Sequence, residues 1–271
     1  MNIMSRIFIT GSSDGIGQAG AKLLADQGHK VFLHARSEAR AKEAKDAVPN
    51  ASGVLVGDIS TIAGAKALAA EAKKAGPWDA VIHNAGLGPG APSRMTEDGF
   101  QSTFAVNSLA PYILTCLMDK PKRLLYLSSG LHYSGSGDFK DITWSKRSWS
   151  SGQAYNDSKL HDVMLANFVA RQWTDVQSCS MDPGWISTKM GGRSAPGQVS
   201  TPGKAIFEFA LGESGIVGDK SAVYFTPQGA KTAQKPALDT SKQDEFVKIC
   251  EELSRISFPK SRPLKIAACK K

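Results

Sequence analysis

Short apolar runs recur along the chain and alternate with longer segments of helical periodicity. Runs of four to six residues that are rich in apolar side chains predict buried strands; they cover residues 6–10, 30–34, 53–57, 80–84, 123–128, 176–181 and 222–225. Between the earlier runs, apolar residues recur at helical spacing, as at Ile16, Ala19, Leu23 and Leu24 and in the alanine-rich stretch 62–75. The pattern therefore predicts strands and helices in alternation.

This alternation determines the fold class that we expect. Strands separated by helices form right-handed βαβ crossovers, which build a parallel sheet covered on both faces. We therefore predict an α/β fold, a Rossmann-type doubly wound parallel sheet of about seven strands, with ligands outside the carboxyl ends of the strands. The 271 residues are compatible with a single domain, which we place at residues 1–259.

Two segments are expected to shape a ligand pocket, at about residues 131–152 and 189–215. Within the second, residues 189–201 are rich in Gly, Ser and Pro and predict a long irregular loop. Such loops are often lids over a site, and the alternative is a plain flexible connection.

The formal net charge of +8 raises the question of an anionic partner. Five of the positive charges lie in the last twelve residues, so the remainder of the chain carries only +3. We interpret residues 260–271 as a basic, flexible and solvated tail, and expect no nucleic acid as a partner, although such a tail could contact phosphate or an anionic membrane. Its charged residues are Lys260, Arg262, Lys265, Lys270 and Lys271.

Other composition features exclude several classes of protein. The four cysteines lie far apart without a C-x-x-C or zinc-ligand spacing, which predicts reduced thiols, a cytoplasmic location and no metal site. The N-terminal sequence runs directly into a predicted strand without the apolar segment of a signal peptide. No window approaches 18 consecutive apolar residues, so we expect no membrane span.

The first predicted strand leads into the sequence TGSSDGIG, residues 10–17. Glycine adopts positive φ and lets a ligand approach the backbone, and the N-terminus of the following helix presents free N–H groups to a pyrophosphate. Because Gly11, Gly15 and Gly17 close a strand and open a helix, they predict a nucleotide-binding loop rather than a merely structural turn.

The second predicted strand is followed by Arg36, where many NAD-binding Rossmann proteins carry an acid. An arginine there suits a 2′-phosphate, so NADP(H) is the preferred cofactor and NAD(H) the alternative. Asp14, inside the glycine loop, weighs against this preference because an acid near a 2′-phosphate is unfavourable. Asp58, after the third strand, could accept a hydrogen bond from the adenine amino group or cap the next helix.

Taken together, four motifs resemble those of the short-chain dehydrogenase/reductase family. TGSSDGIG resembles its T-G-x-x-x-G-x-G loop, HNAG (83–86) its N-N-A-G, YNDSK (155–159) its Y-x-x-S-K, and DPGWIST (182–188) its P-G-x-x-x-T element. The resemblance runs from residue 5 to about residue 258, with His83 and Asp182 as departures from the family pattern.

The spacing before the tyrosine is similar to that of one branch of this family. Ser129 lies 26 residues ahead of Tyr155, and the longer insertion between them resembles that of the retinol dehydrogenases, WW-domain oxidoreductases and protochlorophyllide reductases. Membrane members of that branch carry an N-terminal anchor, which this sequence lacks, so the resemblance implies a soluble relative.

The resemblance implies an enzyme that interconverts a small carbonyl substrate and the corresponding alcohol. Tyr155 would be the general acid/base, since hydride transfer to a carbonyl requires a proton at the oxygen. Lys159 lies four residues later on the same helix face, where at about 4 Å its ammonium would stabilise the phenolate by roughly 4 kcal/mol. Ser129, or its neighbour Ser128, would donate a hydrogen bond to the substrate oxygen.

Other site residues follow from the same resemblance. Asn107 would hold a water that links Lys159 to solvent, or else satisfy a backbone group, and Thr188 would bind the nicotinamide carboxamide. The residues expected to contact the cofactor are Gly11, Ser12, Ser13, Asp14, Gly15, Ile16, Gly17, Arg36, Asp58, Ile59, Asn84, Ala85, Gly86, Tyr155, Lys159, Pro183, Gly184, Ile186 and Thr188.

Several residues near these motifs have two interpretations. His132 could border the substrate pocket, whereas we expect His161 on another helix face, at the surface or in an interface. The aromatic residues of the insertion indicate either an apolar pocket wall, and hence a hydrophobic substrate, or packing of the insertion; they are Tyr133, Phe139, Trp144 and Trp149.

Two further hypotheses concern activity and assembly. A catalytically silent NADP(H)-binding sensor or scaffold is the alternative to an enzyme, but such proteins usually lack the tyrosine or the lysine. The family suggests a homodimer or homotetramer built from the helices that carry Asn107 and Tyr155. The apolar residues of these helices would fit such a bundle or ordinary packing on the sheet; they are Leu109, Ile113, Leu117, Met164, Leu165 and Phe168.

Overall fold

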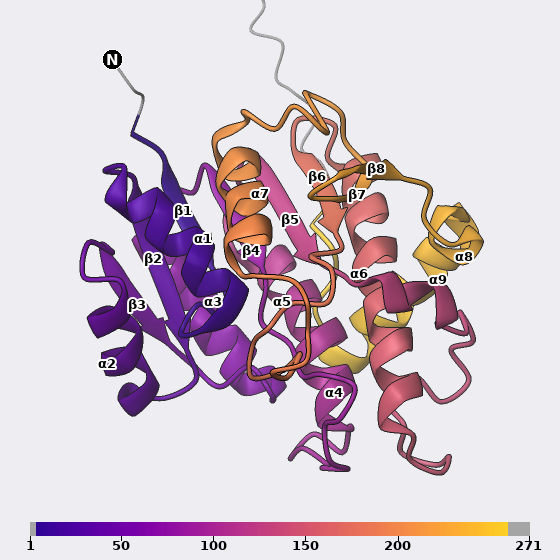
Figure 1. The fold of residues 1–271 in the computed structure, drawn as a ribbon. Coiled ribbons are helices and arrows are strands. Elements are labelled where there is room, and N and C mark those ends of the chain that lie inside the picture. Colours follow the sequence, from indigo (N-terminus) through magenta and orange to yellow (C-terminus); the bar gives the residue numbers. More distant parts are fainter. Residues whose placement is uncertain (1–3, 260–271) are drawn as a thin grey trace, which may run out of the picture.

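The seven predicted strands all form, each within two residues of its expected bounds, and they lie in one sheet (Figure 1). The structure is a computed structural model that describes residues 4–259. The strands are β1 (Arg6–Ile9), β2 (Lys30–Ala35), β3 (Gly53–Val56), β4 (Ala80–His83), β5 (Arg123–Leu127), β6 (Gln177–Met181), β7 (Tyr224–Thr226) and β8 (Gly229–Lys231).

The sheet order is β3-β2-β1-β4-β5-β6-β7-β8, and β1 to β7 pair in parallel. The order reverses between β1 and β4, which is the switch point where ligands bind in doubly wound sheets. The additional strand β8 pairs antiparallel with β7 at the edge. Its three residues, Gly-Ala-Lys, have no apolar alternation, so the hydrophobic pattern does not predict it.

Helices cover both faces of the sheet, as the pattern predicts (Figure 1). They are α1 (Gly15–Asp26), α2 (Glu38–Ala47), α3 (Ile62–Ala75), α4 (Ser102–Phe104), the π-helical turn η1 (Ala105–Leu109), α5 (Ala110–Leu117), the 3₁₀ turn η2 (Gly130–Ser134), α6 (Ser151–Gln172), α7 (Ser200–Leu211), α8 (Lys235–Leu238) and α9 (Thr240–Ser254). The expected α/β doubly wound fold is confirmed.

Each face has its own hydrophobic core because side chains alternate along a strand. In β1, Ile7 and Ile9 pack in the core with α1, α2 and α7, whereas Phe8 belongs to the core with α3, α5, α6 and α9. The second core contains the helix that carries the tyrosine-lysine motif, and its packing therefore holds that helix against the sheet.

The 22-residue helix α6 is buried around most of its circumference, polar residues included, because it is covered on two sides. It packs on β5 and β6, and α8 and α9 lie along it on the side away from the sheet (Figure 1). The segment after α9 adds to this cover, since Phe258 stacks edge to face on Phe168 with the ring centroids 5.0 Å apart. Side chains proposed for an oligomer interface are thus already buried within one chain, namely Leu109, Ile113, Met164, Leu165 and Phe168.

The two predicted pocket loops differ in how much of them is irregular. Residues 135–150 and 189–199 lack regular secondary structure, but the second predicted loop also contains α7, which the Gly- and Pro-rich start of that segment obscures. Within the insertion Phe139 and Trp144 are buried. Phe139 packs against the domain, with its ring centroid 6.1 Å from that of Phe246 of α9, whereas Trp144 contacts Trp149 and Arg147 of the insertion. The predicted tail 260–271 lies outside the described residues, and no helix within residues 4–259 is both long and apolar enough to cross a membrane.

Candidate active site

The glycine loop after β1 lies directly against the segment after β4. A Cβ atom on Gly11 would stand 2.6 Å from the Cα of Ala85, and one on Gly17 would collide with the side-chain amide of Asn84. Gly11 also has a φ of +61°, which favours glycine. The two loops can therefore approach this closely only because these positions carry no side chain.

Asn84 connects the ends of β1 and β4 through hydrogen bonds. Its Nδ2 atom donates to the carbonyls of Thr10 and Gly11, both at 2.9 Å. In return, the Thr10 hydroxyl accepts from the backbone N–H groups of Asn84 and Ala85, at 2.9 and 3.0 Å. Asn84 thus has a structural role in shaping the predicted nucleotide loop.

His34, at the end of β2, supports the same loop and is a site residue that the motifs do not predict. Its Nδ1 atom accepts a hydrogen bond from the Gly11 N–H at 3.0 Å, so Nε2 carries the proton and donates to Gly57 O at 2.9 Å. Burial lowers the pKa of His34 and favours this neutral form. Ser12 is engaged similarly, because its hydroxyl donates to Ile9 O and accepts from the His34 N–H.

The open side of the glycine loop is rich in charged groups. Asp14 precedes α1 but makes no capping bond to it; its carboxylate pairs with Arg40 at 2.6 Å and with Lys189 at 3.1 Å. Arg40, on α2, also donates to the Ser13 hydroxyl at 3.1 Å and pairs with Glu43. The negative charge of Asp14 is therefore matched by two cations.

Arg36 and Asp58 occupy the positions expected from the strand ends, and both are exposed. Asp58 accepts a hydrogen bond from the Ser60 N–H at 2.9 Å, whereas the cap of α3 is Thr61, which accepts from Gly64. The alternative that Asp58 caps this helix is therefore wrong, because the helix begins one turn later than that interpretation requires. Ile59 is buried in the core beside it.

These features fit a dinucleotide. The α1 N-terminus lacks a side-chain cap, so its first N–H groups are open to a pyrophosphate. Gly15, in this turn, has a φ of +61° and presents backbone rather than a side chain to that space. Arg36 and Arg40 lie beyond the loop on the β2–α2 side, where the adenosine end of a dinucleotide lies in this fold.

Tyr155 and Lys159 lie on α6, and both residues are almost fully buried, with 7% and 5% exposed. The Lys159 Nζ atom is 5.7 Å from the centroid of the Tyr155 ring. Gly86 reaches this pair from the β4 side, since a Cβ on it would lie 3.7 Å from Lys159 Nζ and 3.5 Å from Asn107 Oδ1. The structure thus brings together the predicted tyrosine, lysine and asparagine and the segment that follows β4.

Two protein groups bind the Lys159 ammonium. Nζ donates to the carbonyl of Leu127 at 2.6 Å and to Oδ2 of Asp162 at 2.8 Å. Burial raises the pKa of the Asp162 carboxyl to about 6, although the charge of Lys159 opposes this. For Lys159, burial lowers the pKa, but the charges of Asp162 and Tyr155 outweigh it and the net shift is upward. The family motif does not point to Asp162.

The two adjacent serines have different partners. Ser128 is buried and donates its hydroxyl to the Lys159 carbonyl at 2.7 Å. Ser129 is partly exposed, and its hydroxyl oxygen accepts from the Leu131 N–H at 3.2 Å, which leaves its proton available to a ligand. The geometry therefore favours Ser129 over Ser128 as a donor to substrate.

His132 holds the backbone of Ser129 in place. Its Nδ1–H donates to Ser129 O at 2.8 Å, while Nε2 accepts from the Gln234 N–H at 3.2 Å. The ring is fully buried against Tyr133 and Tyr224, and burial lowers the pKa of His132. His132 is thus a neutral structural link rather than an exposed base.

Asn107 lies in the π-helical turn η1, and its side chain is fully engaged. Oδ1 accepts from the Leu87 N–H at 2.7 Å, and Nδ2 donates to Leu87 O at 2.9 Å and to the Ser158 hydroxyl at 3.0 Å. Of the two roles considered for Asn107, its side chain shows the structural one, since it satisfies the backbone N–H and carbonyl of Leu87. It fixes the segment after β4 to α6.

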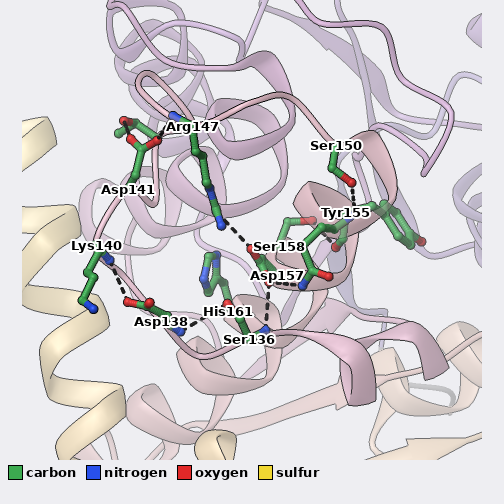
Figure 2. A network of polar contacts seen from close by, with 12 residues as sticks. Ser136, Asp138, Lys140, Asp141, Arg147, Ser150, Tyr155, Asp157, Ser158 and His161 are labelled. Carbon is green, nitrogen blue, oxygen red and sulfur yellow. Dashed lines mark hydrogen bonds and ion pairs between the residues drawn. The ribbon is translucent and has the colours of Figure 1, made fainter.

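Figure 2 shows the network that fastens the insertion to the helix bearing Tyr155. Asp157, two residues after the tyrosine and buried, pairs with Arg147 of the insertion at 3.1 Å. It also accepts hydrogen bonds from the Ser136 N–H at 2.9 Å and from Gln153 at 2.8 Å. The Arg147 guanidinium stacks over the Trp144 ring at 3.3 Å.

His161 belongs to the neighbourhood of this network, and its predicted surface position is wrong. It is 4% exposed, hydrogen-bonds to the Ser108 hydroxyl at 3.0 Å and stacks on Phe246 of α9 with the ring centroids 4.7 Å apart. Burial lowers the pKa of His161 to about 4. The helix face seemed free because the pattern of α6 alone does not reveal that α9 covers it.

The loop after β6 folds toward the glycine loop. A Cβ on Gly15 would stand 3.4 Å from Cγ2 of Thr188, whose hydroxyl oxygen accepts from the Gly191 N–H at 3.0 Å. Trp185 and Met190 of this loop are exposed large apolar side chains, with 61% and 49% accessible. The same segment carries the remaining residues expected to contact the cofactor, Pro183, Gly184 and Ile186.

A metal centre has no support in the part of the chain that the structure describes. No group of three or more His, Cys, Asp or Glu side chains there could hold an ion. Three of the four cysteines, Cys116, Cys179 and Cys250, are free thiols buried in the protein.

Comparison with known proteins places these features in a family. Residues 5–121 match the family described as short chain dehydrogenase. The uncharacterized oxidoreductase AN7799 of Emericella nidulans is 52% identical over 260 residues, which cover 94% of this chain and 99% of that protein. Retinol dehydrogenase 13 of Homo sapiens is 32% identical over 199 residues, or 68% of this chain and 60% of that protein.

A solved structure shows the same fold at low identity. The blue fluorescent protein from a metagenomic library, in complex with NADPH, has a TM-score of 0.65 and 19% identity, covering 83% of this chain and 97% of that one. With the four motifs, the tyrosine-lysine pair and a relative that matches nearly the whole length, the chain belongs to the short-chain dehydrogenase/reductase family, with relatives among the retinol dehydrogenases, and is an oxidoreductase.

Proposed function

We propose that the protein is an NADP(H)-dependent oxidoreductase that interconverts a carbonyl and an alcohol on a small, hydrophobic substrate. The observation that carries this proposal is the contact of Lys159 with Tyr155, whose ring centroid is 5.7 Å from Nζ, and with the carbonyl of Leu127, at the end of the strand that leads into Ser129. A carbonyl needs a proton source at its oxygen when it is reduced, and a buried phenol beside an ammonium is suited to supply one.

The chain's own residues have separate tasks in this mechanism. Bound NADPH supplies the hydride. Tyr155 donates its phenolic proton to the substrate oxygen in reduction and accepts it in oxidation. Ser129 donates a hydrogen bond to the same oxygen, and Lys159 stabilises the phenolate by its charge. Asn107 is a positioning residue that holds the segment after β4 against α6.

For the cofactor, we propose that the glycine loop and the α1 N-terminus hold the pyrophosphate and that the segment 84–86 passes beside the ribose. Arg36 and Arg40 are the proposed ligands of the 2′-phosphate. Asp14 would repel a 2′-phosphate, but Arg40 offsets its negative charge, since the guanidinium lies 2.6 Å from the carboxylate. The NADPH complex of a protein with this fold is compatible with the same choice.

For the substrate, we propose an apolar aldehyde, ketone or secondary alcohol. Large apolar side chains are exposed in two places, the segment after Ser129 and the loop after β6. An apolar ligand bound there would remove them from water. They are Leu131, Tyr133, Trp185 and Met190.

Location and assembly remain part of the proposal. A cytoplasmic location is supported by three buried free thiols, which a reducing compartment preserves.

A homodimer or homotetramer would need a surface other than the predicted helix faces, because α9 and the residues after it cover them. Sedimentation velocity of the purified chain measures the assembly directly.

The experiment that tests the proposed function follows the reduced-nicotinamide absorbance with NADPH, and separately NADH, against a panel of apolar aldehydes and ketones. We expect faster loss of the NADPH signal, and its abolition in Tyr155→Phe. Faster consumption of NADH would contradict the cofactor assignment. Binding of NADPH without turnover of any carbonyl or alcohol would instead favour a silent sensor or scaffold.

A further inference from the structure

The ion pair between Lys159 and Asp162 lies inside the protein. Both residues are at least 95% buried, one turn apart on α6, with Nζ and Oδ2 separated by 2.8 Å. An ionised carboxylate is rarely enclosed in this way unless it is paired, and here its partner is the lysine of the active-site motif. The pair is therefore part of the environment in which Tyr155 gains and loses its proton.

We propose that Asp162 is a positioning residue that holds the Lys159 ammonium in place and sets the pH range in which Tyr155 exchanges its proton. This inference rests on the proposed role of Tyr155 as general acid/base. Asp162 is not a catalytic residue in this account, because it acts on the phenol only through Lys159 and through its own charge.

The first part of the argument concerns hydrogen bonds. An ammonium has three N–H donors, and Lys159 gives one to Leu127 O and one to Asp162. One donor remains for the phenol or for a ribose hydroxyl. Asp162 therefore fixes where Nζ sits and how many contacts it can make toward the reacting groups.

The second part concerns charge. Lys159 alone would place an uncompensated positive charge beside Tyr155, which favours the phenolate. The Asp162 carboxylate, in contact with that ammonium, offsets much of this field in the poorly polarisable interior. Loss of the carboxylate should therefore shift the ionisation of Tyr155 to lower pH, provided that Lys159 keeps its proton.

The ionisable groups around Asp162 are either neutral or paired elsewhere, so its carboxylate is the negative charge that acts on Lys159. From β5, Tyr126 faces it as a neutral phenol, hydrogen-bonded to Thr115 at 2.8 Å, and burial together with nearby acidic groups raises the pKa of Tyr126. Cys116 of α5 acts on Tyr126, and it is neutral because burial raises the pKa of its thiol to about 12. The other ionisable residues of α6 that face the insertion form a separate set with Arg147, namely Asp157 and His161.

The test is a spectrophotometric titration of tyrosinate in the cofactor-free protein, which requires neither substrate nor turnover. The chain has five tyrosines, and burial raises the pKa of Tyr112, Tyr126, Tyr133 and Tyr224. The component of the titration that disappears in Tyr155→Phe therefore belongs to Tyr155. In Asp162→Asn we expect its midpoint to move down by about one pH unit, the size expected for one buried charge several ångströms away.

Asp157→Asn is the matched control, since it makes the same chemical change at the other buried aspartate of the same helix. Its partner is Arg147, so the Tyr155 midpoint should move by less than about 0.3 unit. Asp162→Ser, also neutral but smaller, provides the same comparison if the amide prevents folding. An unchanged midpoint in the neutral Asp162 variants, or an equal shift in Asp157→Asn, would overturn the inference.

Turnover gives a second and separable readout. The acidic limb of the pH profile for alcohol oxidation should move down by the same amount in Asp162→Asn, since that direction requires the phenolate. If Tyr155→Phe retains full turnover, the proposed function fails, yet the titration still reports whether Asp162 controls Tyr155. If Tyr155→Phe is inactive and the titration midpoint does not move, only the inference about Asp162 fails.

Discussion

The Nδ1 atom of His34 accepts a hydrogen bond from the backbone N–H of Gly11, at 3.0 Å. The imidazole lies at the end of β2 and is buried, and its Nε2–H is held by Gly57 O. The neutral imidazole on β2 thus fixes Gly11, the first glycine of the predicted nucleotide loop after β1. The arrangement exists only while His34 is neutral, because a protonated Nδ1 cannot accept a hydrogen bond.

This contact predicts that cofactor binding weakens in acid. The pKa of His34 is lowered in the folded protein, so its contribution to stability is complete above the ordinary value of 6.5 and is lost as the pH falls below it. Calorimetric titration should show a weaker NADPH affinity at pH 5 than at pH 7. In His34→Phe the affinity should be lower by a factor that corresponds to about 1–3 kcal/mol, with a smaller pH dependence.

His29 provides a control for this experiment. Its Nδ1 accepts from the Ser5 N–H at 3.2 Å, the same kind of contact at the opposite end of the strand. His29→Phe should leave NADPH affinity unchanged. Equal weakening in both variants would show that the effect is general destabilisation rather than loss of support for the loop.

The ion pair between Arg40 and Asp14 predicts cofactor preference. Arg40→Ala removes a cation from the proposed 2′-phosphate site and leaves Asp14 with one partner fewer. We expect the Kd for NADPH to rise by about 10- to 100-fold, the effect of losing a charged hydrogen bond, with little change for NADH. Arg171→Ala, which breaks a surface pair with Asp244, should change neither constant. Equal losses for both cofactors in Arg40→Ala would refute the assignment.

The close approach of the loops after β1 and β4 predicts a strong effect of one added methyl group. In Gly11→Ala the new Cβ would meet the Ala85 backbone at 2.6 Å at a positive φ. We expect the free energy of unfolding to fall by about 1–3 kcal/mol and NADPH binding to be lost. Gly90→Ala, where a Cβ meets nothing within 4 Å, should be silent in denaturant titration. A fully stable Gly11→Ala protein that binds NADPH would contradict this geometry.

The network of Figure 2 predicts that the insertion and the active-site helix depend on each other. Arg147→Met leaves the buried Asp157 carboxylate without its cation. The free energy of unfolding should fall by about 1–3 kcal/mol, which is less than for a fully buried ion pair because Arg147 is partly exposed. Limited proteolysis should then cut within residues 135–150 sooner than in the wild type. Unchanged proteolysis would show that the ion pair does not fasten the insertion.

Much of this molecule is predictable from local sequence. Apolar runs separated by helical periodicity are enough for the parallel sheet, and the stretch 62–75 forms α3 with the predicted bounds. The glycine loop and the tyrosine-lysine pair are visible because each is a short motif at a fixed spacing. These elements depend on residues near one another in the chain.

The remainder depends on contacts between distant segments. His34 and Arg40 act on the glycine loop from β2 and α2, and neither belongs to a motif. His161 is buried because α9, about 80 residues later, folds back over α6. From the sequence, Asp162 is one more polar residue of a helix. Only the fold buries it beside Lys159, with Tyr126 of β5 nearby, and there its charge acts on the lysine.

The most direct test of the central claim compares the wild type with Tyr155→Phe. The initial rate of NADPH oxidation is measured with the best carbonyl of the panel, and NADPH affinity is measured on the same preparations. We predict a rate lower by about 10²–10⁴-fold in the variant, with unchanged affinity, because the phenolic proton is lost and the ring remains. A Tyr155→Phe protein that binds NADPH and retains the wild-type rate would contradict the account.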